Sequence, residues 1–114
     1  MKYLLQIFTS QTSAAFDQLS EEEKNAVHAE YMAIAQTAGV MDGYELQPAE
    51  TATTVRVQDG RTLTTDGPFV ETKEAFAGYY LFEAEDLDGA IELSTRIPAA
   101  RLGGAIEVRP VVER

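Results

Sequence analysis

The sequence has 114 residues, enough for one domain with its own hydrophobic core and too few for two. Nine Lys and Arg residues against 19 Asp and Glu residues give a formal net charge of −10. This charge repels phosphate backbones and anionic lipid headgroups, so it argues against nucleic-acid binding and membrane docking. The chain has no cysteine and one histidine, which excludes disulfides, thiolate zinc sites and multi-histidine metal sites within one chain. We expect no metal and no cofactor. Without a signal peptide or a long apolar run, we expect a cytoplasmic protein.

The first third of the chain predicts a strand, a helix and a second strand. Residues 2–8 are nearly all apolar, which is typical of a strand covered on both faces. Ser20 and Glu23 form a capping box, so a helix should begin there and run to about Ala38. Residues 40–46 predict a short strand. The helix face expected to pack on the sheet carries Val27, Tyr31, Ile34 and Ala38.

The middle of the chain predicts a β-hairpin followed by another strand. Residues 51–57 are rich in Thr and Val, and Asp59-Gly60 is a favoured two-residue hairpin turn. Residues 61–65 supply the return strand. After a turn, residues 76–84 predict a further strand.

The last third predicts a helix and a final strand. Asp86 is the expected helix cap and Pro98 ends the helix. Residues 105–112 predict the closing strand. The packed face of this helix is expected to carry Leu87, Ala90, Ile91 and Ser94.

This order of elements predicts an α+β fold over residues 1–114. We expect a two-layer sandwich with both helices on one face of a mainly antiparallel sheet. A β-α-β-β-α-β order is the ferredoxin-like pattern. The first and last strands are apolar on both sides, so a second subunit is expected to cover the free sheet face and form a homodimer.

A nine-residue motif in the middle of the chain carries the most specific signal. Residues 66–74 read DGPFVETKE and closely resemble the signature of the DGPF (DGPFAETKE) proteins of the YCII-related superfamily. The resemblance continues at residues 59–61, 78–80 and 107–110. It implies a ferredoxin-like fold that assembles as a dimeric α/β barrel. It implies no single established function.

The resemblance also indicates where an active site would lie. Some distant YCII-related proteins are small-molecule enzymes with a proposed histidine–aspartate pair. His28 stands eleven residues before Gly39 and corresponds to that histidine. The aspartate is expected near the end of the first strand, where residues 9–11 read Thr-Ser-Gln, which leaves Asp17 or Asp66 to replace it. Genes of DGPF proteins often neighbour those of extracytoplasmic-function sigma factors, which implies a link to stress regulation.

Two residues are the candidates for catalysis. His28, the sole imidazole, is the natural general base near neutral pH; the alternative is a boundary histidine bonded to a neighbour. Asp66 is a candidate base or ligand-orienting group; the alternative is an aspartate that caps the following turn.

A larger set of residues is the candidate ligand-binding rim. Arginine suits a ligand carboxylate, and the alternative for each arginine is a pair with Glu71 or Glu107. The charged residues of the motif are equally compatible with a solvated ion-pair segment. The candidate ligand-binding residues are Asp66, Gly67, Pro68, Phe69, Glu71, Lys73, Glu74, Arg56 and Arg109.

These observations leave several functions open. The first is a module that binds a small molecule in a dimeric ferredoxin-like barrel, with the DGPF loop at its mouth, and that is linked to sigma-factor regulation. The alternative is a lyase- or hydrolase-like enzyme with His28 as general base and Asp66 orienting the substrate. A third is a structural partner of a sigma factor.

Overall fold

The computed structural model describes residues 1–10 and 14–114. The elements in this part of the chain are β1 (Lys2–Ser10), α1 (Glu21–Ala35), β2 (Val40–Glu45), η1 (Ala49–Thr51), β3 (Thr53–Gln58), β4 (Arg61–Asp66), β5 (Glu74–Glu83), α2 (Leu87–Thr95), η2 (Pro98–Ala100) and β6 (Ala105–Pro110), where η marks a short 3₁₀ helix. The predicted order of strands and helices is confirmed.

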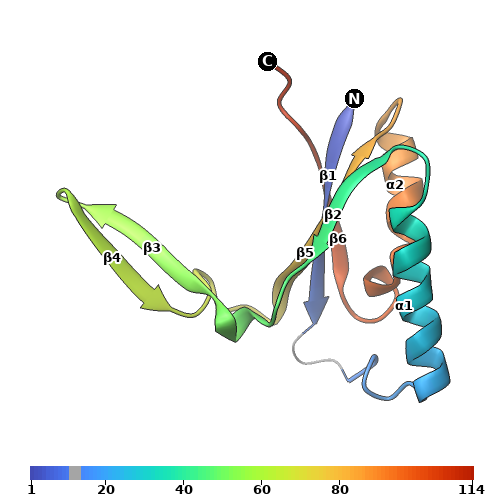
Figure 1. The fold of residues 1–114 in the computed structure, drawn as a ribbon, viewed down its shortest axis with the longest axis horizontal. Helices are drawn as coiled ribbons and strands as arrows, with labels where there is room; N and C mark the ends of the chain where they lie inside the picture. The colour runs from blue at the N-terminus through green and yellow to red at the C-terminus, as the bar shows by residue number, and fades with distance from the viewer. Residues whose placement is uncertain (11–13) are drawn as a thin grey trace.

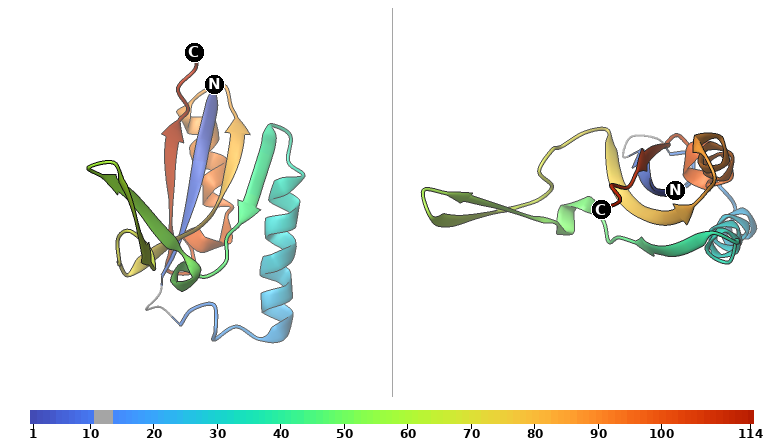
Figure 2. Two further views of the ribbon diagram at one scale, coloured as in Figure 1. Left: turned by 60° about the vertical axis from the view of Figure 1, so that its left-hand side comes forward. Right: turned by 90° about the horizontal axis from the view of Figure 1, so that it is seen from above.

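Four of the strands form one antiparallel sheet in the order β2-β5-β1-β6. With α1 between β1 and β2, and α2 between β5 and β6, this order is consistent with a ferredoxin-like fold. Both helices lie on the same face of the sheet (Figure 1, Figure 2). The β3–β4 hairpin is a separate two-stranded sheet inserted between β2 and β5.

The hydrophobic core lies between this sheet and the two helices. Alternate residues of β1, namely Tyr3, Leu5 and Ile7, are buried on the side that faces the helices. Leu93 and Ile97 meet them from the helical layer. Full burial of a leucine such as Leu5 stabilises the fold by about 1.5–3 kcal/mol. The opposite face of the sheet has no covering layer among the described residues (Figure 2).

The capping box at the start of α1 is confirmed. The Glu23 amide donates to Ser20 Oγ, and the Ser20 amide donates to Glu23 Oε1, both at 3.1 Å. The helix ends at Ala35 rather than at the predicted Ala38, because the next two amides bond to carbonyls three residues back. Gly39, at φ +94°, then turns the chain into β2.

The cap of α2 is confirmed and its packed face is partly different from the prediction. Asp86 accepts a hydrogen bond from the Gly89 amide at 3.0 Å. Leu87 and Ile91 are 48% and 45% exposed, so the prediction that they pack inward is wrong. The apolar residues of α2 span too wide an arc to face one surface, and the sheet side takes the arc around Leu93. The buried residues of α2 are Ala90, Leu93 and Ser94.

The hairpin at residues 53–66, here called the arm, projects away from the sheet on the side opposite the helices (Figure 1). Asp59 and Gly60 have φ values of +50° and +76°, the left-handed conformation that a two-residue hairpin turn needs. The base of the arm is fixed where the Gly67 amide donates to the Ala52 carbonyl at 2.7 Å and Thr54 Oγ1 donates to the Gly67 carbonyl at 2.8 Å. The predicted hairpin is therefore confirmed.

Candidate functional site

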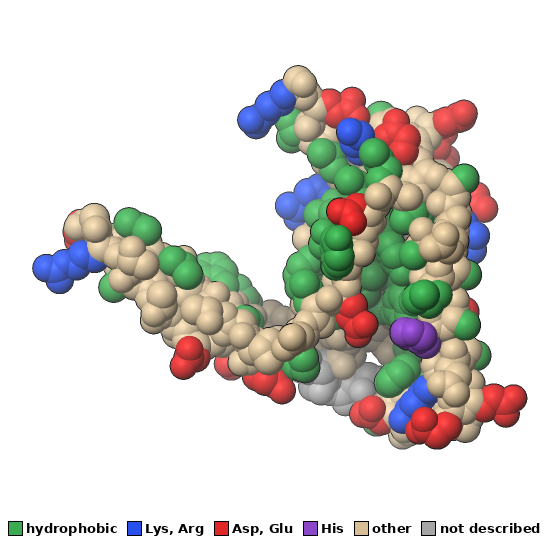
Figure 3. All heavy atoms as spheres, in the orientation of Figure 1, with side chains coloured by type: hydrophobic (Ala, Val, Ile, Leu, Met, Phe, Trp, Pro, Cys, Tyr) green, Lys and Arg blue, Asp and Glu red, His purple; other side chains and the backbone are tan. Residues whose placement is uncertain are grey.

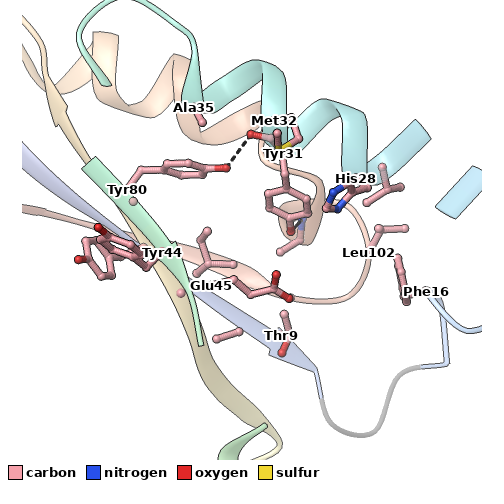
Figure 4. Close-up of a pocket in the computed structure, with 18 of the residues that line it drawn as sticks. Thr9, Phe16, His28, Tyr31, Met32, Ala35, Tyr44, Glu45, Tyr80 and Leu102 are labelled. Carbon is pink, nitrogen blue, oxygen red and sulfur yellow. Dashed lines mark hydrogen bonds between the residues drawn. The ribbon is translucent and has the colours of Figure 1, made fainter. Parts of the chain in front are cut away.

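A pocket of about 420 Å³ opens between α1 and the helix-facing side of the sheet (Figure 4). This volume lies in the range of sites that hold small organic molecules. Its walls are mostly aromatic and aliphatic, with a few polar groups among them. The residues that define it for the argument below are Thr9, Phe16, His28, Tyr31, Glu45 and Tyr80.

Helix α1 supplies one wall of the pocket. His28, Tyr31, Met32 and Ala35 stand at positions i, i+3, i+4 and i+7, so helical periodicity places them on one stripe. The side chain of His28 is exposed at the pocket surface, whereas that of Tyr31 is half-buried. Tyr31 was predicted only as a residue that packs on the sheet; its spacing of three residues from His28 is the signal that could have identified it as a pocket residue.

Two tyrosine hydroxyls connect the elements around the pocket. Tyr80 Oη, from β5, donates to the Tyr31 carbonyl oxygen of α1 at 3.0 Å. The Ala99 amide of η2 donates to Tyr31 Oη at 3.2 Å. Sheet, α1 and η2 are thus joined by side chains of the pocket itself, which fixes its width.

Glu45, the last residue of β2, brings a carboxylate to this pocket. Burial raises the pKa of Tyr80 to about 12, and Tyr31 and the Glu45 charge act in the same direction. Burial is also the main cause of the raised pKa of Tyr31, opposed by the hydrogen bond from Ala99 and supported by Glu45. Both phenols therefore stay protonated near neutral pH. Figure 4 shows Glu45 and Thr9 pointing into the space beneath Tyr31.

The lower rim of the pocket holds a cation over an aromatic ring. Lys24 Nζ lies 5.6 Å from the centroid of the Phe16 ring, within the range of a cation–π contact. It also lies 3.9 Å from Glu21 Oε1 in an exposed ion pair. Because Phe16 precedes α1 in the turn after β1, this contact positions that turn against the pocket.

The structure places the two candidate catalytic residues apart. His28 lines the pocket, whereas Asp66 ends β4 at the base of the arm, on the other side of the sheet (Figure 1). Within one chain the two side chains are not brought together. Asp17, the other substitute considered, lies in the exposed turn before α1 and does not line the pocket.

The candidate rim residues are divided between two places. Arg56 stacks on Phe69, with its guanidinium carbon 4.7 Å from the ring centroid. Lys73 and Glu74 line a second, more open hollow with Phe8.

The remaining rim residues do not join a common cluster. Gly67, at φ +103°, and Pro68 form the turn at the base of the arm, and Glu71 is exposed in the following segment. Arg109 forms a salt bridge with Glu107, the pairing named above as its alternative role. The motif thus builds the junction between the arm and β5. No direct signal in the sequence marked Glu45 or Tyr80 as a site residue.

Neither a metal-binding cluster nor a membrane-spanning helix occurs in the part of the chain that the structure describes. Residues 1–10 and 14–114 contain no group of three or more His, Asp or Glu side chains placed to hold a metal ion. Every helix in the same part of the chain is too short or too polar to span a lipid bilayer.

Fold and pocket together define an α+β domain with a small-molecule-sized cavity between helix and sheet. The chain belongs to the YCII-related family, because the model of the YCII-related domain matches residues 1–114. It is also similar to an uncharacterized protein of Rhizobium meliloti (strain 1021). The two are 34% identical over 104 residues, which cover 90% of this chain and 82% of that relative.

Proposed function

We propose that this protein binds a small organic molecule in the pocket between α1 and the sheet. The observation that carries the proposal is a cavity of about 420 Å³ whose aromatic walls surround a few convergent polar groups. Such cavities are the usual sites for small ligands, since apolar walls supply affinity and the polar groups supply orientation.

The polar groups favour one ligand chemistry. Glu45 offers a carboxylate and Tyr31 a protonated phenol beneath α1, with the His28 imidazole beside them. Phe16 and Tyr80 both line the pocket, so a flat aromatic ligand would contact aromatic rings there, and an amine or hydroxyl on it would donate to Glu45. The net charge of −10 acts against anionic ligands at the same place.

A thermal-shift screen of the pure protein tests this proposal. The panel holds aromatic amines, phenols, aromatic and aliphatic acids, and divalent metals. A ligand that binds the folded state raises the melting temperature by mass action. We expect hits among the aromatic amines and phenols, and we expect His28→Ala and Glu45→Gln to reduce their shifts. Glu50→Gln, the same change at an exposed residue outside the pocket, is the control.

The outcomes separate the proposals. Hits that persist unchanged in both pocket variants would place the ligand elsewhere, and Asp66→Ala then tests the DGPF loop. No shift with any compound of the panel would count against an aromatic ligand and would favour binding of a protein partner instead.

An enzyme is the second candidate, because His28 and Glu45 line the same pocket. In this proposal His28 is the general base. Glu45 orients the substrate, the role predicted for Asp66 from the sequence. The two candidates differ in what His28→Ala removes. An enzyme loses turnover with any hit compound, whereas a binding protein shows no turnover in the parent either.

We further propose that the chain is one of the DGPF proteins and forms the dimeric α/β barrel that this resemblance implies. The uncovered sheet face supports the dimer, because Leu4, Phe8 and Leu81 stand half-exposed on it. A sigma-factor partner rests on the resemblance alone. It predicts a co-purifying complex that salt weakens, since the chain is strongly acidic.

A further inference from the structure

Among residues 1–10 and 14–114, no helix or sheet packs against the arm, and its two strands pair only with each other. Every residue of β4 and all but Thr54 of β3 are exposed. Figure 2, seen from above, shows it extending well beyond the sheet. A lone two-stranded hairpin is at best marginally stable in water. Some other surface must therefore stabilise it.

One face of the arm carries exposed apolar side chains. The register pairs Val55 with Thr64 and Val57 with Thr62, so these four β-branched residues share a face. The two valines are 60% and 69% exposed. Hydrophobic side chains are visible along the arm in Figure 3.

The other face of the arm already makes contacts within the chain. Arg56 is paired with Leu63 on it and stacks on Phe69, and Thr54 is hydrogen-bonded to the Gly67 carbonyl. The face of Val55 and Val57 is therefore the one left for a partner.

The chain as a whole exposes more surface than its size requires. Its accessible area is 8108 Å², whereas a compact monomer of 12.5 kDa exposes about 6,200 Å². Its radius of gyration is 16.0 Å against about 13 Å for a compact domain of this length. The excess of roughly 1,900 Å² per chain is what an obligate dimer interface buries from each subunit.

We propose that the arm docks on a second copy of this chain, with the Val55 and Val57 face against the partner subunit. The inference rests on the proposed dimer and adds a second contact to the packing of the sheet faces. The charge of the arm is compatible with this docking. The arm carries two arginines and two aspartates, so it brings no net charge to a chain of net charge −10. Docking covers the exposed valines and gives the two-stranded hairpin a surface to pack on.

The test measures self-association of the full chain by analytical ultracentrifugation. The double variant Val55→Gln with Val57→Gln removes the apolar face without changing charge. Leu63→Gln makes the same kind of change on the opposite face of the same hairpin and is the matched control. We expect a dimer whose dissociation constant rises at least tenfold in the double variant and less than threefold in the control.

Cross-linking identifies what the arm touches. The photoreactive p-benzoylphenylalanine replaces Val57, and light and ¹⁵N-labelled chains are mixed before irradiation. We expect covalent dimers that join light to heavy chains. Cross-links within one chain, or an unchanged dissociation constant in the double variant, would overturn the proposal for the arm.

A third variant separates this proposal from the proposed barrel. Leu81→Gln alters the sheet face and leaves the arm intact. A dimer that Leu81→Gln weakens and the arm variant does not would refute arm docking while keeping the sheet-face dimer. A parent protein that stays monomeric at several hundred micromolar would refute both.

Discussion

Tyr80 and Tyr31 are joined by a hydrogen bond of 3.0 Å from the hydroxyl of the strand residue to the backbone carbonyl of the helix residue. The bond crosses the wall of the pocket. It gives the buried Tyr80 hydroxyl a partner and sets the distance between α1 and β5. A single side chain thus contributes to core packing and to the shape of the candidate site.

Tyr80→Phe removes this bond and keeps the ring. We expect a loss of about 1 kcal/mol in the free energy of unfolding, the usual net value of one buried hydrogen bond. The carbonyl of Tyr31 keeps its partner within α1, so the cost stays small. Urea unfolding at neutral pH measures it, with Tyr44→Phe as the exposed control. A loss above about 3 kcal/mol would mean that the hydroxyl holds more than this one contact.

The same residue predicts a pH dependence. The pKa of Tyr80 in the folded protein is about 12, above the ordinary value of 10.0. The unfolded chain therefore releases its proton first as the pH rises. The contribution of Tyr80 to stability is complete below about pH 10 and is lost between pH 10 and 12. Melting temperatures from pH 9 to 12 should fall less steeply in Tyr80→Phe than in the parent protein, and equal slopes would contradict the prediction.

Two glycines predict opposite effects of the same substitution. A Cβ at Gly104 would overlap the Phe8 carbonyl oxygen and lie 3.0 Å from that of Ala99. Backbone would have to move, so Gly104→Ala should cost about 3 kcal/mol or more. Gly89 lies in α2, and a Cβ added there would meet nothing closer than 3.5 Å. Gly89→Ala should therefore stabilise the fold by about 0.5–1 kcal/mol.

Thermal unfolding of these two glycine variants, side by side, checks both signs. Destabilisation by Gly89→Ala would show that the first turn of α2 needs the freedom of glycine, and a neutral Gly104→Ala would place β6 farther from β1 than described.

The capping box predicts the cost of losing one side chain at the start of α1. Ser20→Ala removes the acceptor of the Glu23 amide, which should cost about 1 kcal/mol and lower the melting temperature by roughly 4 °C. Ser20→Asp keeps an acceptor and should retain most of the stability. If both variants melt alike, the cap contributes nothing measurable. His28 lies two turns further along α1, so ligand binding in the pocket should depend little on this change.

The sequence by itself determined the features that depend on neighbours along the chain. Ser20 with Glu23, Asp86 and Asp59-Gly60 act through local hydrogen bonds and backbone conformation, and each starts or turns an element where it was predicted. Residues 2–8 were likewise predicted as a strand from their apolar run, and Lys2–Ser10 form β1. Local rules of this kind need no knowledge of the fold.

Only the tertiary structure decided which distant residues meet. Glu45 and Tyr80 lie 17 and 52 positions after His28, and only the sheet order β2-β5-β1 brings them to the same pocket. Asp66 was a candidate partner of His28 in the sequence, but the hairpin inserted between β2 and β5 carries it to the other side of the sheet. Which side chains share a site depends on strand order and on the face each strand presents, and neither is encoded in local spacing.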